Sequence, residues 1–201
     1  MPTTKTALLV MDVQAGIVER FAQGSEELLA ALRRAIDAAR AAGMPVIYVR
    51  VAFREGAPEV SPNNRAFSAL AGASGFGDAD PATQVHAAVA PEPADVVVVK
   101  KRVSAFAGSD LDVVLRSLAV DSLVLSGIAT SGVVLSTLRQ AADLDYRLTV
   151  LRDACADGDP EVHRVLMDKV FPRQAAVVTV DEWIGDAAGP GVATPGPATT
   201  S

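Results

Sequence analysis

Two charged side chains stand directly behind apolar runs, where an acid and a base could share a site. Asp12 follows the run at residues 7–11, and Lys100 follows four consecutive valines. Taken singly, each has an ordinary reading as a solvated loop residue, a helix cap or a lysine that snorkels out of the core. Taken together, we expect them on neighbouring strand ends of one sheet, facing a shared crevice. A carboxylate beside an ammonium keeps both groups charged and supplies a proton donor or acceptor.

Short apolar runs alternate with longer amphipathic stretches along the chain. Strands are predicted at residues 7–11, 46–49, 96–99, 122–126, 148–151 and 176–180. Helices are predicted at residues 26–42, 110–119, 131–144 and 160–170. This alternation indicates β-α-β crossovers, and therefore an α/β protein with three α/β/α layers around a mainly parallel six-stranded sheet. Ligands of such sheets bind beyond the carboxyl ends of the strands, which is where Asp12 and Lys100 stand.

The connection between the second and third strands, residues 52–94, is rich in Gly, Pro, Asn and Asp. Short helices are predicted within it near residues 66–70 and 82–89. A connection of this length is uncommon unless it has a task such as covering a site. We expect one domain over residues 1–185, followed by a disordered tail at residues 186–201 that is too poor in large apolar side chains to order itself.

Composition excludes several function classes. The chain has 201 residues, of which 50% are hydrophobic, and a net charge of −6, so a nucleic-acid partner is not expected. The sequence shows neither a signal-peptide pattern nor an apolar run long enough for a membrane span, which predicts a cytoplasmic protein without a membrane partner. A single cysteine offers no internal disulfide framework and no zinc-ligand spacing.

Four motifs, taken in order, resemble the isochorismatase-like hydrolases, also called the cysteine hydrolases. They lie at residues 9–14, 100–106, 127–132 and 153–154, and the resemblance runs from about residue 6 to about residue 182. The resemblance implies that Asp12 is a general base and that Lys100 stabilises charge, with Lys101 as the next candidate for the lysine. It places the nucleophilic cysteine of the family at the position that Val133 occupies here.

The resemblance also implies how negative charge on a reacting oxygen would be held. It predicts a cis peptide bond between Ile128 and Ala129, and an oxyanion hole formed by the backbone N–H groups of Ala129 and Val133. Backbone donors at the start of a helix do not depend on the side chain, so this part of the site could survive the loss of the cysteine.

Valine cannot act as a nucleophile, and no other residue replaces the missing thiol convincingly. Cys155 follows a different strand and reads as a buried structural cysteine. Ser104, Thr130 and Ser131 carry hydroxyls near the site, but Ser131 is better explained as a helix cap. A serine there would need Asp12 as its base.

The two histidines and the metal-binding pattern of nicotinamidases do not support a metal site. His86 and His163 both fall on predicted helices outside the motifs, and residues 50–54, where the nicotinamidases carry paired histidines, contain none. We therefore expect no metal and no cofactor.

Three readings of the function remain open. The first is a small-molecule hydrolase that uses Asp12 and Lys100 without a cysteine nucleophile, on an enol ether as in the isochorismatases or by activating water directly. The second is a catalytically silent relative that binds a small molecule or a partner in the old pocket, and the third is a structural subunit. The resemblance also implies a homo-oligomer. Further candidates for substrate binding are Gln14, Arg54, Phe106 and Ser131.

Overall fold

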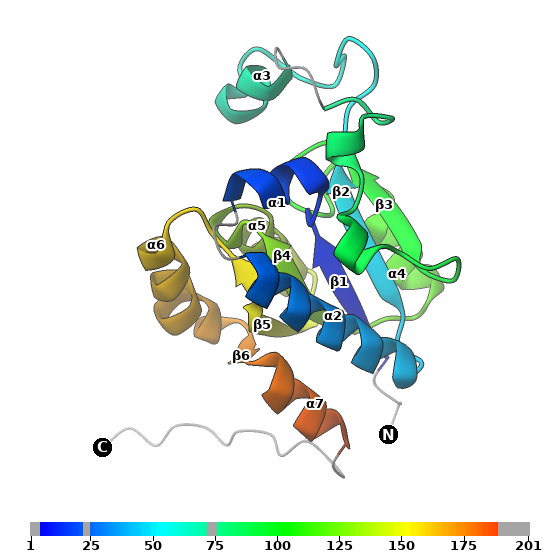
Figure 1. Ribbon diagram of the computed structural model, residues 1–201, viewed down its shortest axis with the longest axis vertical. Coiled ribbons are helices and arrows are strands. Elements are labelled where there is room, and N and C mark those ends of the chain that lie inside the picture. Colours follow the sequence, from blue (N-terminus) through cyan, green and yellow to red (C-terminus); the bar gives the residue numbers. More distant parts are fainter. Residues whose placement is uncertain (1–4, 22–24, 72–75, 189–201) are drawn as a thin grey trace.

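Six strands form one parallel sheet in the order β3-β2-β1-β4-β5-β6 in the computed structural model, which describes residues 5–21, 25–71 and 76–188 (Figure 1). The strands are β1 (Thr6–Met11), β2 (Val46–Val51), β3 (Val96–Lys100), β4 (Ser122–Ile128), β5 (Arg147–Ala156) and β6 (Ala176–Val178). The α/β class and the six-stranded sheet predicted from the sequence are thereby confirmed, and the sheet is parallel throughout. Since β1 and β4 lie at the centre, the residues that follow them reach the middle of the sheet edge.

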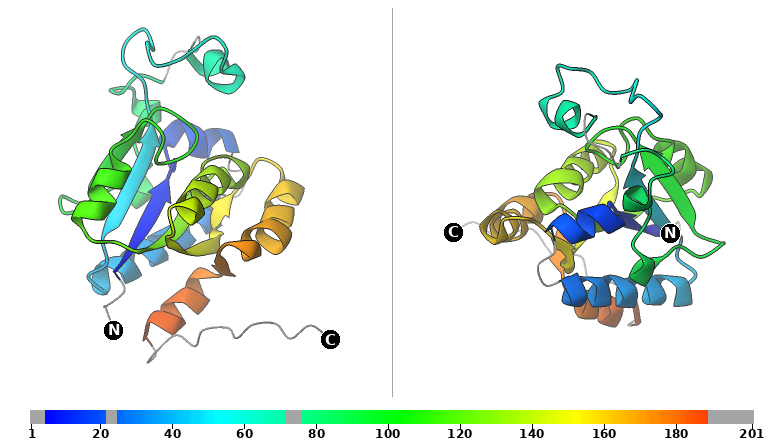
Figure 2. Two further views of the ribbon diagram at one scale, coloured as in Figure 1. Left: turned by 180° about the vertical axis from the view of Figure 1, so that it is seen from behind. Right: turned by 45° about the horizontal axis from the view of Figure 1, so that its top comes forward.

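The helices flank the sheet on both faces. They are α1 (Ala15–Phe21), α2 (Ser25–Ala41), α3 (Arg65–Ala71), α4 (Leu111–Ser117), α5 (Leu135–Asp143), α6 (Pro160–Val165) and α7 (Val180–Ala188). The side chains of β1 alternate between the two cores, so that Leu8 and Val10 pack toward α2 and α7 while Leu9 and Met11 pack toward α4 and α5. The opposed views in Figures 1 and 2 show α2 and α7 on one side of the sheet and α4 and α5 on the other.

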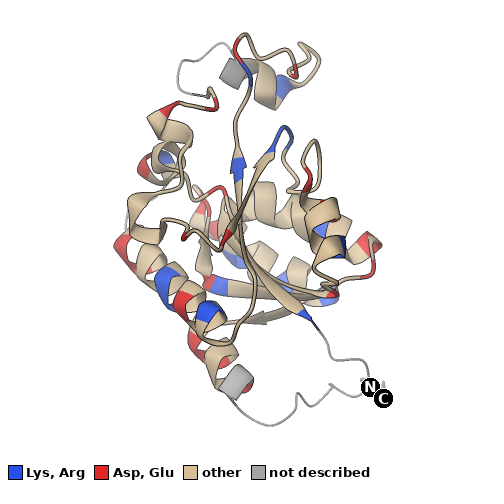
Figure 3. Cartoon of the chain, turned by 90° about the vertical axis from the view of Figure 1, so that its right-hand side faces the viewer, with Lys and Arg blue, Asp and Glu red and all other residues tan. Residues whose placement is uncertain are grey.

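Helix α2 shows why local sequence suffices for much of this fold. Its apolar residues recur at helical spacing and are buried, Glu26 and Glu27 lie in its first turn, and Arg40 lies in its last. The chain then turns at Gly43, which has φ +65°, as the sequence predicts for the end of this helix. Lys, Arg, Asp and Glu gather on the helices and loops, whereas the strands carry few of them (Figure 3).

Two helices were not predicted from the sequence. Helix α1 occupies the segment after β1, and α7 follows β6, which ends at Val178 rather than at Val180. The start of α7 is a capping box, in which the Thr179 backbone N–H donates to Glu182 Oε2 (2.7 Å) and the Glu182 N–H donates to Thr179 Oγ1 (3.2 Å). Because α7 continues to Ala188, residues 186–188 of the expected tail are helical, and the rest of that tail lies outside the described residues.

Other predictions need smaller corrections. The helix expected at residues 82–89 is two separate 3₁₀ turns, Pro81–Thr83 and Ala87–Val89, because the chain between them is extended and Val85 forms an antiparallel bridge with Gln14. The helix expected at residues 131–144 begins with an irregular π-helical turn, Thr130–Val134, before α5. No helix among the described residues is long and apolar enough to span a bilayer.

Candidate active site

A cavity of about 420 Å³ opens at the carboxyl ends of the strands. Asp12 lies in its wall after β1, Lys100 at the end of β3, and Ile128, Ala129 and Val133 at the end of β4 and in the turn that follows. The cavity also borders the long connection between β2 and β3, as the length of that connection predicts. From this connection come Ala66, Phe67, Phe76, Ala82 and Thr83.

The two carboxylate oxygens of Asp12 have different surroundings. Oδ2 lies 2.9 Å from Lys100 Nζ, whereas Oδ1 is buried and has no hydrogen-bond partner among the described residues. Burial raises the pKa of the Asp12 carboxyl above its ordinary value of 3.8, and the nearby Lys100 ammonium only partly opposes that rise. Burial thus works against the expectation that the lysine simply keeps this acid charged.

Lys100 reaches Asp12 across an intervening strand. The sequence predicts neighbouring strand ends, but β2 lies between β1 and β3, so that prediction is wrong. The long lysine side chain, 2% exposed, spans this gap, and its ammonium also donates to the carbonyl oxygen of Arg102 (2.9 Å). Lys101 points elsewhere and donates to the carbonyl oxygen of Ala52 (2.5 Å), so Lys100 is the lysine of the cavity.

The backbone after β4 turns sharply into the cavity wall. Gly127 has φ +130°, and a Cβ at this position would come within 1.9 Å of the Met11 carbonyl oxygen, so only glycine fits between the two central strands. The peptide bond between Ile128 and Ala129 is cis, as predicted. Val133 follows in the π-helical turn, is 1% exposed, and lines the same cavity as Asp12 and Lys100.

The same turn is held from outside by the segment that contains α6. The hydroxyl of Thr130, which is fully buried, lies 2.8 Å from His163 Nδ1, and the backbone N–H of Ser131 donates to Asp157 Oδ2 (2.7 Å). Burial lowers the pKa of His163. The sequence pattern did not single out His163, because its contact with Thr130 exists only once α6 packs beside the turn.

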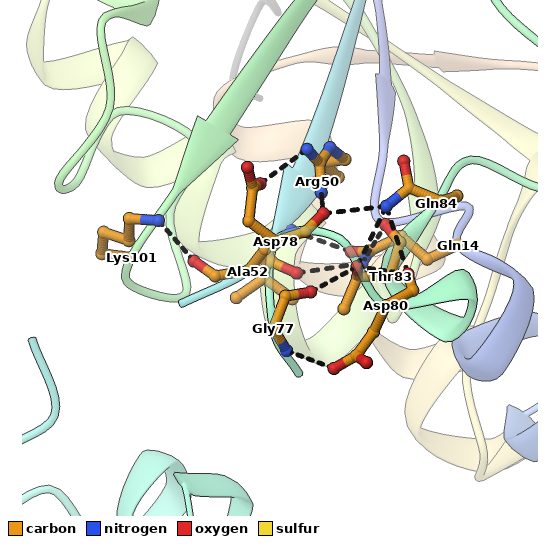
Figure 4. Close-up of polar contacts among 10 residues, drawn as sticks. Gln14, Arg50, Ala52, Gly77, Asp78, Asp80, Thr83, Gln84 and Lys101 are labelled. Atoms are coloured by element: carbon orange, nitrogen blue, oxygen red, sulfur yellow. Dashed lines mark hydrogen bonds and ion pairs between the residues drawn. The ribbon is translucent and has the colours of Figure 1, made fainter. Parts of the chain in front are cut away.

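Gln14 joins β1 to its surroundings rather than offering free polar atoms. Its Nε2 donates to the carbonyl oxygens of Val51 (2.9 Å) and Thr83 (2.8 Å), and its Oε1 accepts from the Val51 N–H (2.8 Å). Gln14 therefore lines the cavity but spends its hydrogen bonds on tying the long connection to the sheet. Figure 4 shows this network together with the ion pair of Arg50 with Asp78.

Three other candidates for substrate binding lie outside the cavity wall. Arg54 is exposed and pairs with Glu59 (2.7 Å), because its loop turns away from the sheet. Phe106 is buried and packs its ring against Tyr146, with a centroid separation of 6.1 Å. Ser131 is exposed, and its side chain makes no capping hydrogen bond at the start of the turn or of α5.

Cys155 is buried on β5 and does not line this cavity. Burial raises the pKa of its thiol to about 12, so the thiolate is scarce at neutral pH. It borders a separate groove of about 530 Å³ between α2 and α6, together with His163. Within the described residues, no cluster of histidine, cysteine and carboxylate side chains could hold a metal ion.

Helix α1 supplies a part of the wall that sequence reasoning missed. Ile17, Arg20 and Phe21 line the cavity from this helix, and Val103 lines it from the loop after β3. A spacing of three to four residues places the α1 side chains on one helical face, and this spacing is the signal that could have found them.

Comparisons with known proteins show which proteins this chain resembles in sequence and in fold. The model of the isochorismatase domain matches residues 6–182. The ureidoacrylate amidohydrolase RutB of Stutzerimonas stutzeri is 33% identical over an alignment that covers 92% of this chain and 79% of the relative. A crystal structure of a cysteine hydrolase from Pseudomonas syringae has a TM-score of 0.83 at 26% identity, covering 92% of this chain and 94% of its own. N-carbamoylsarcosine amidase from Thermoplasma acidophilum has a TM-score of 0.73 at 28% identity, covering 89% and 98%.

Proposed function

Because this chain belongs to the isochorismatase family, we propose that it is a small-molecule hydrolase in which Asp12 and Lys100 act without a cysteine nucleophile. Two observations support the absence of thiol chemistry. Val133, which the resemblance to the family motif puts at the position of the nucleophile, lines the cavity with Asp12. The single cysteine of the chain, Cys155, lies outside this cavity and has a raised pKa.

The observation that carries the proposal is the asymmetry of Asp12. Lys100 holds Oδ2 in place, and Oδ1 is left as a buried acceptor or donor beside the cavity without a partner in the described part of the chain. A buried polar atom without a hydrogen bond costs free energy, and a bound substrate or water would recover it. Burial also raises the pKa of the carboxyl toward neutral pH, and a general acid or base works best when its pKa lies near the working pH.

With Asp12 protonated, the site suits hydrolysis of an enol ether. The carboxyl transfers its proton to the terminal carbon of the double bond, which leaves an oxocarbenium ion on the neighbouring carbon. Water adds to that carbon and returns a proton to the Asp12 carboxylate, and the resulting hemiketal breaks into a ketone and an alcohol. Lys100 favours the carboxylate that forms when the proton leaves, and therefore assists the transfer.

With Asp12 ionised, the same atom suits direct attack by water on an amide or ureide. The carboxylate accepts a proton from water while the oxygen of that water adds to the carbonyl carbon, and it then returns the proton to the departing nitrogen. In this route the backbone N–H groups of Ala129 and Val133 would stabilise the oxyanion. The names of the relatives, an amidohydrolase and an amidase, support this second class of substrate.

Turnover of a substrate panel tests the proposal. Purified full-length protein is incubated with enol ethers, amides and ureides, and product release is measured from pH 4 to pH 9. We expect hydrolysis of at least one member, and a loss of at least about 100-fold in Asp12→Asn, as is typical when a general acid or base is removed. Activity that persists in both Asp12→Asn and Lys100→Met would refute the mechanism.

The pH profile separates the two routes. The acid route requires protonated Asp12 and loses rate as the pH rises through its pKa, whereas the base route gains rate over the same range. Cys155→Ser is the matched control, because a non-thiol mechanism predicts unchanged activity and no inhibition by iodoacetamide. Saturable binding of panel members without any turnover would instead support the silent-binding alternative.

A further inference from the structure

The charges that line the cavity do not cancel. Three charged side chains contribute to its wall among the described residues, namely Asp12, Lys100 and Arg20. An ionised Asp12 neutralises Lys100 at 2.9 Å, and no second carboxylate lines the cavity within the described chain. The balance is then the one positive charge of Arg20, and protonation of Asp12 only adds to it.

Arg20 also differs from three arginines at or near the ends of β2 and β3. Arg50 pairs with Asp78 (2.7 Å), Arg54 pairs with Glu59 (2.7 Å), and the guanidinium of Arg102 donates to the carbonyl oxygens of Lys101 and Glu59. These three are committed to the protein itself. In the described part of the chain Arg20 has neither an ion pair nor a hydrogen bond through its side chain, so its guanidinium is free to take a ligand.

The rest of the outer wall is apolar. Phe21 and Val103 each line the cavity and remain 37% exposed, which places partly exposed, large apolar side chains in its wall. Phe67 and Phe76 add aromatic surface from the long connection. Exposed apolar surface around a cavity marks a place where a ligand is covered.

The charged residues lie at different depths in the cavity. Asp12 and Lys100 are 6% and 2% exposed, whereas Arg20 is exposed. A ligand that satisfies both ends has its anionic group at the mouth, an apolar body along the wall and its reacting bond at the inner end. Arginine suits a carboxylate in particular, because its planar guanidinium can donate two parallel hydrogen bonds.

We propose that the cavity is specific for small carboxylates with an apolar body, and that Arg20 at its mouth binds the carboxylate. The placement of the reacting bond at Asp12 rests on the proposed function. The selection of an anion does not, because it requires binding alone.

Binding of a matched pair of probes tests the inference. Phenylacetate and phenylacetamide have nearly the same shape and differ by one negative charge, and titration calorimetry or ligand-observed NMR gives the dissociation constant of each for the full chain. We expect phenylacetate to bind about tenfold more tightly, and this preference to vanish in Arg20→Gln while the affinity for phenylacetamide is unchanged. Tenfold corresponds to about 1.4 kcal/mol.

Arg54→Gln is the control for net charge. It removes the same charge from an exposed arginine outside the cavity wall, so it should retain the tenfold preference. The inference is overturned if Arg20→Gln keeps the preference, if Arg54→Gln loses it equally, if the wild type does not distinguish the probes, or if it binds neither.

The variant Asp12→Asn separates this inference from the proposed function. It should keep at least the wild-type preference for phenylacetate, since the carboxamide leaves Arg20 in place and no longer neutralises Lys100. Anion binding without turnover of any substrate would refute the proposed hydrolase function and support the carboxylate site at Arg20. Turnover of substrates with no preference for a carboxylate would support the hydrolase function and refute the carboxylate site.

Discussion

Removing the ammonium of Lys100 should destabilise the protein in a way that depends on pH. The variant Lys100→Met keeps most of the side-chain length but leaves the Asp12 carboxyl buried without a cation. Two unit charges 2.9 Å apart attract by ~6 kcal/mol at an effective dielectric constant of about 20. The loss of unfolding free energy does not reach this value, because the Asp12 carboxyl can become neutral by taking up a proton.

Protonation of Asp12 limits how much unfolding free energy the variant loses. A fully buried carboxyl without a cation has a pKa raised by about 3 to 5 units, and each unit is worth about 1.4 kcal/mol. At neutral pH the variant should therefore lose about 3–5 kcal/mol of unfolding free energy, which is also the usual cost of removing one partner of a buried ion pair. Burial already raises the pKa of Asp12 in the wild type, and losing Lys100 raises it further.

The sign of the pH dependence follows from this direction. Above the ordinary carboxyl value of 3.8 the unfolded chain releases the proton, whereas the folded variant keeps it. The deficit should be small near pH 4 and should grow as the pH rises, until the folded carboxyl also ionises. Urea unfolding of both proteins at about pH 4 and about pH 7.5 measures this difference.

Two companion variants make the measurement decisive. Lys101→Met removes the same charge one residue away, from a lysine that donates to a carbonyl oxygen and is only one of several groups that lower the pKa of Glu59, so its cost should change far less between the two pH values. Asp12→Asn combined with Lys100→Met should be about 2 kcal/mol more stable than Lys100→Met alone at pH 7.5, since no carboxyl remains to be buried. An equal cost for Lys100→Met at both pH values would refute the reasoning.

Three further predictions concern the turn after β4 and its support. Gly127→Ala should lower the free energy of unfolding by more than about 3 kcal/mol, because its Cβ would lie 1.9 Å from the Met11 carbonyl oxygen. Gly43→Ala, with open space around it, should lower it by about 1 kcal/mol. Urea unfolding measures both values, and equal losses would contradict the prediction. Burial lowers the pKa of His163, so the free energy of unfolding should fall as the pH drops below about 6.5, where the unfolded chain takes up the proton first. His163→Gln should remove this part of the pH dependence of stability. An unchanged pH dependence in the variant would show that His163 does not cause it. Val133→Cys should gain amidase activity that iodoacetamide abolishes, and a variant that folds but gains none would show that the remaining geometry does not suit a thiol.

Most strands could be located from the sequence because burial on both faces forces apolar runs that are visible locally, although β5 continues to Ala156, past its predicted end at residue 151. The run before Asp12 and the four valines before Lys100 are strands for this reason, and each ends at its charged residue or within one position of it. The turn at Gly127 and the cis bond between Ile128 and Ala129 were expected from the resemblance to the family motif, and the structure contains both.

Prediction from sequence failed where a partner comes from elsewhere in the fold. Gln14 looked free to bind a substrate, yet its amide is spent on Val51 and Thr83. Arg54 looked like a cation for an anionic substrate, but its loop carries it to Glu59, while Arg20 on an unpredicted helix lines the cavity instead. The composition of a segment does not reveal which distant segment it will face.

The sequence by itself determined the kind of sheet and the strand ends that bear Asp12 and Lys100. Only the tertiary structure decided that Lys100 reaches Asp12 across β2 and that one buried carboxylate oxygen has no hydrogen-bond partner among the described residues. The apolar runs and the residues that follow them can be read from short stretches of sequence. Strand order, burial and the resulting rise in the pKa of Asp12 depend on segments that meet only when the whole sheet has formed.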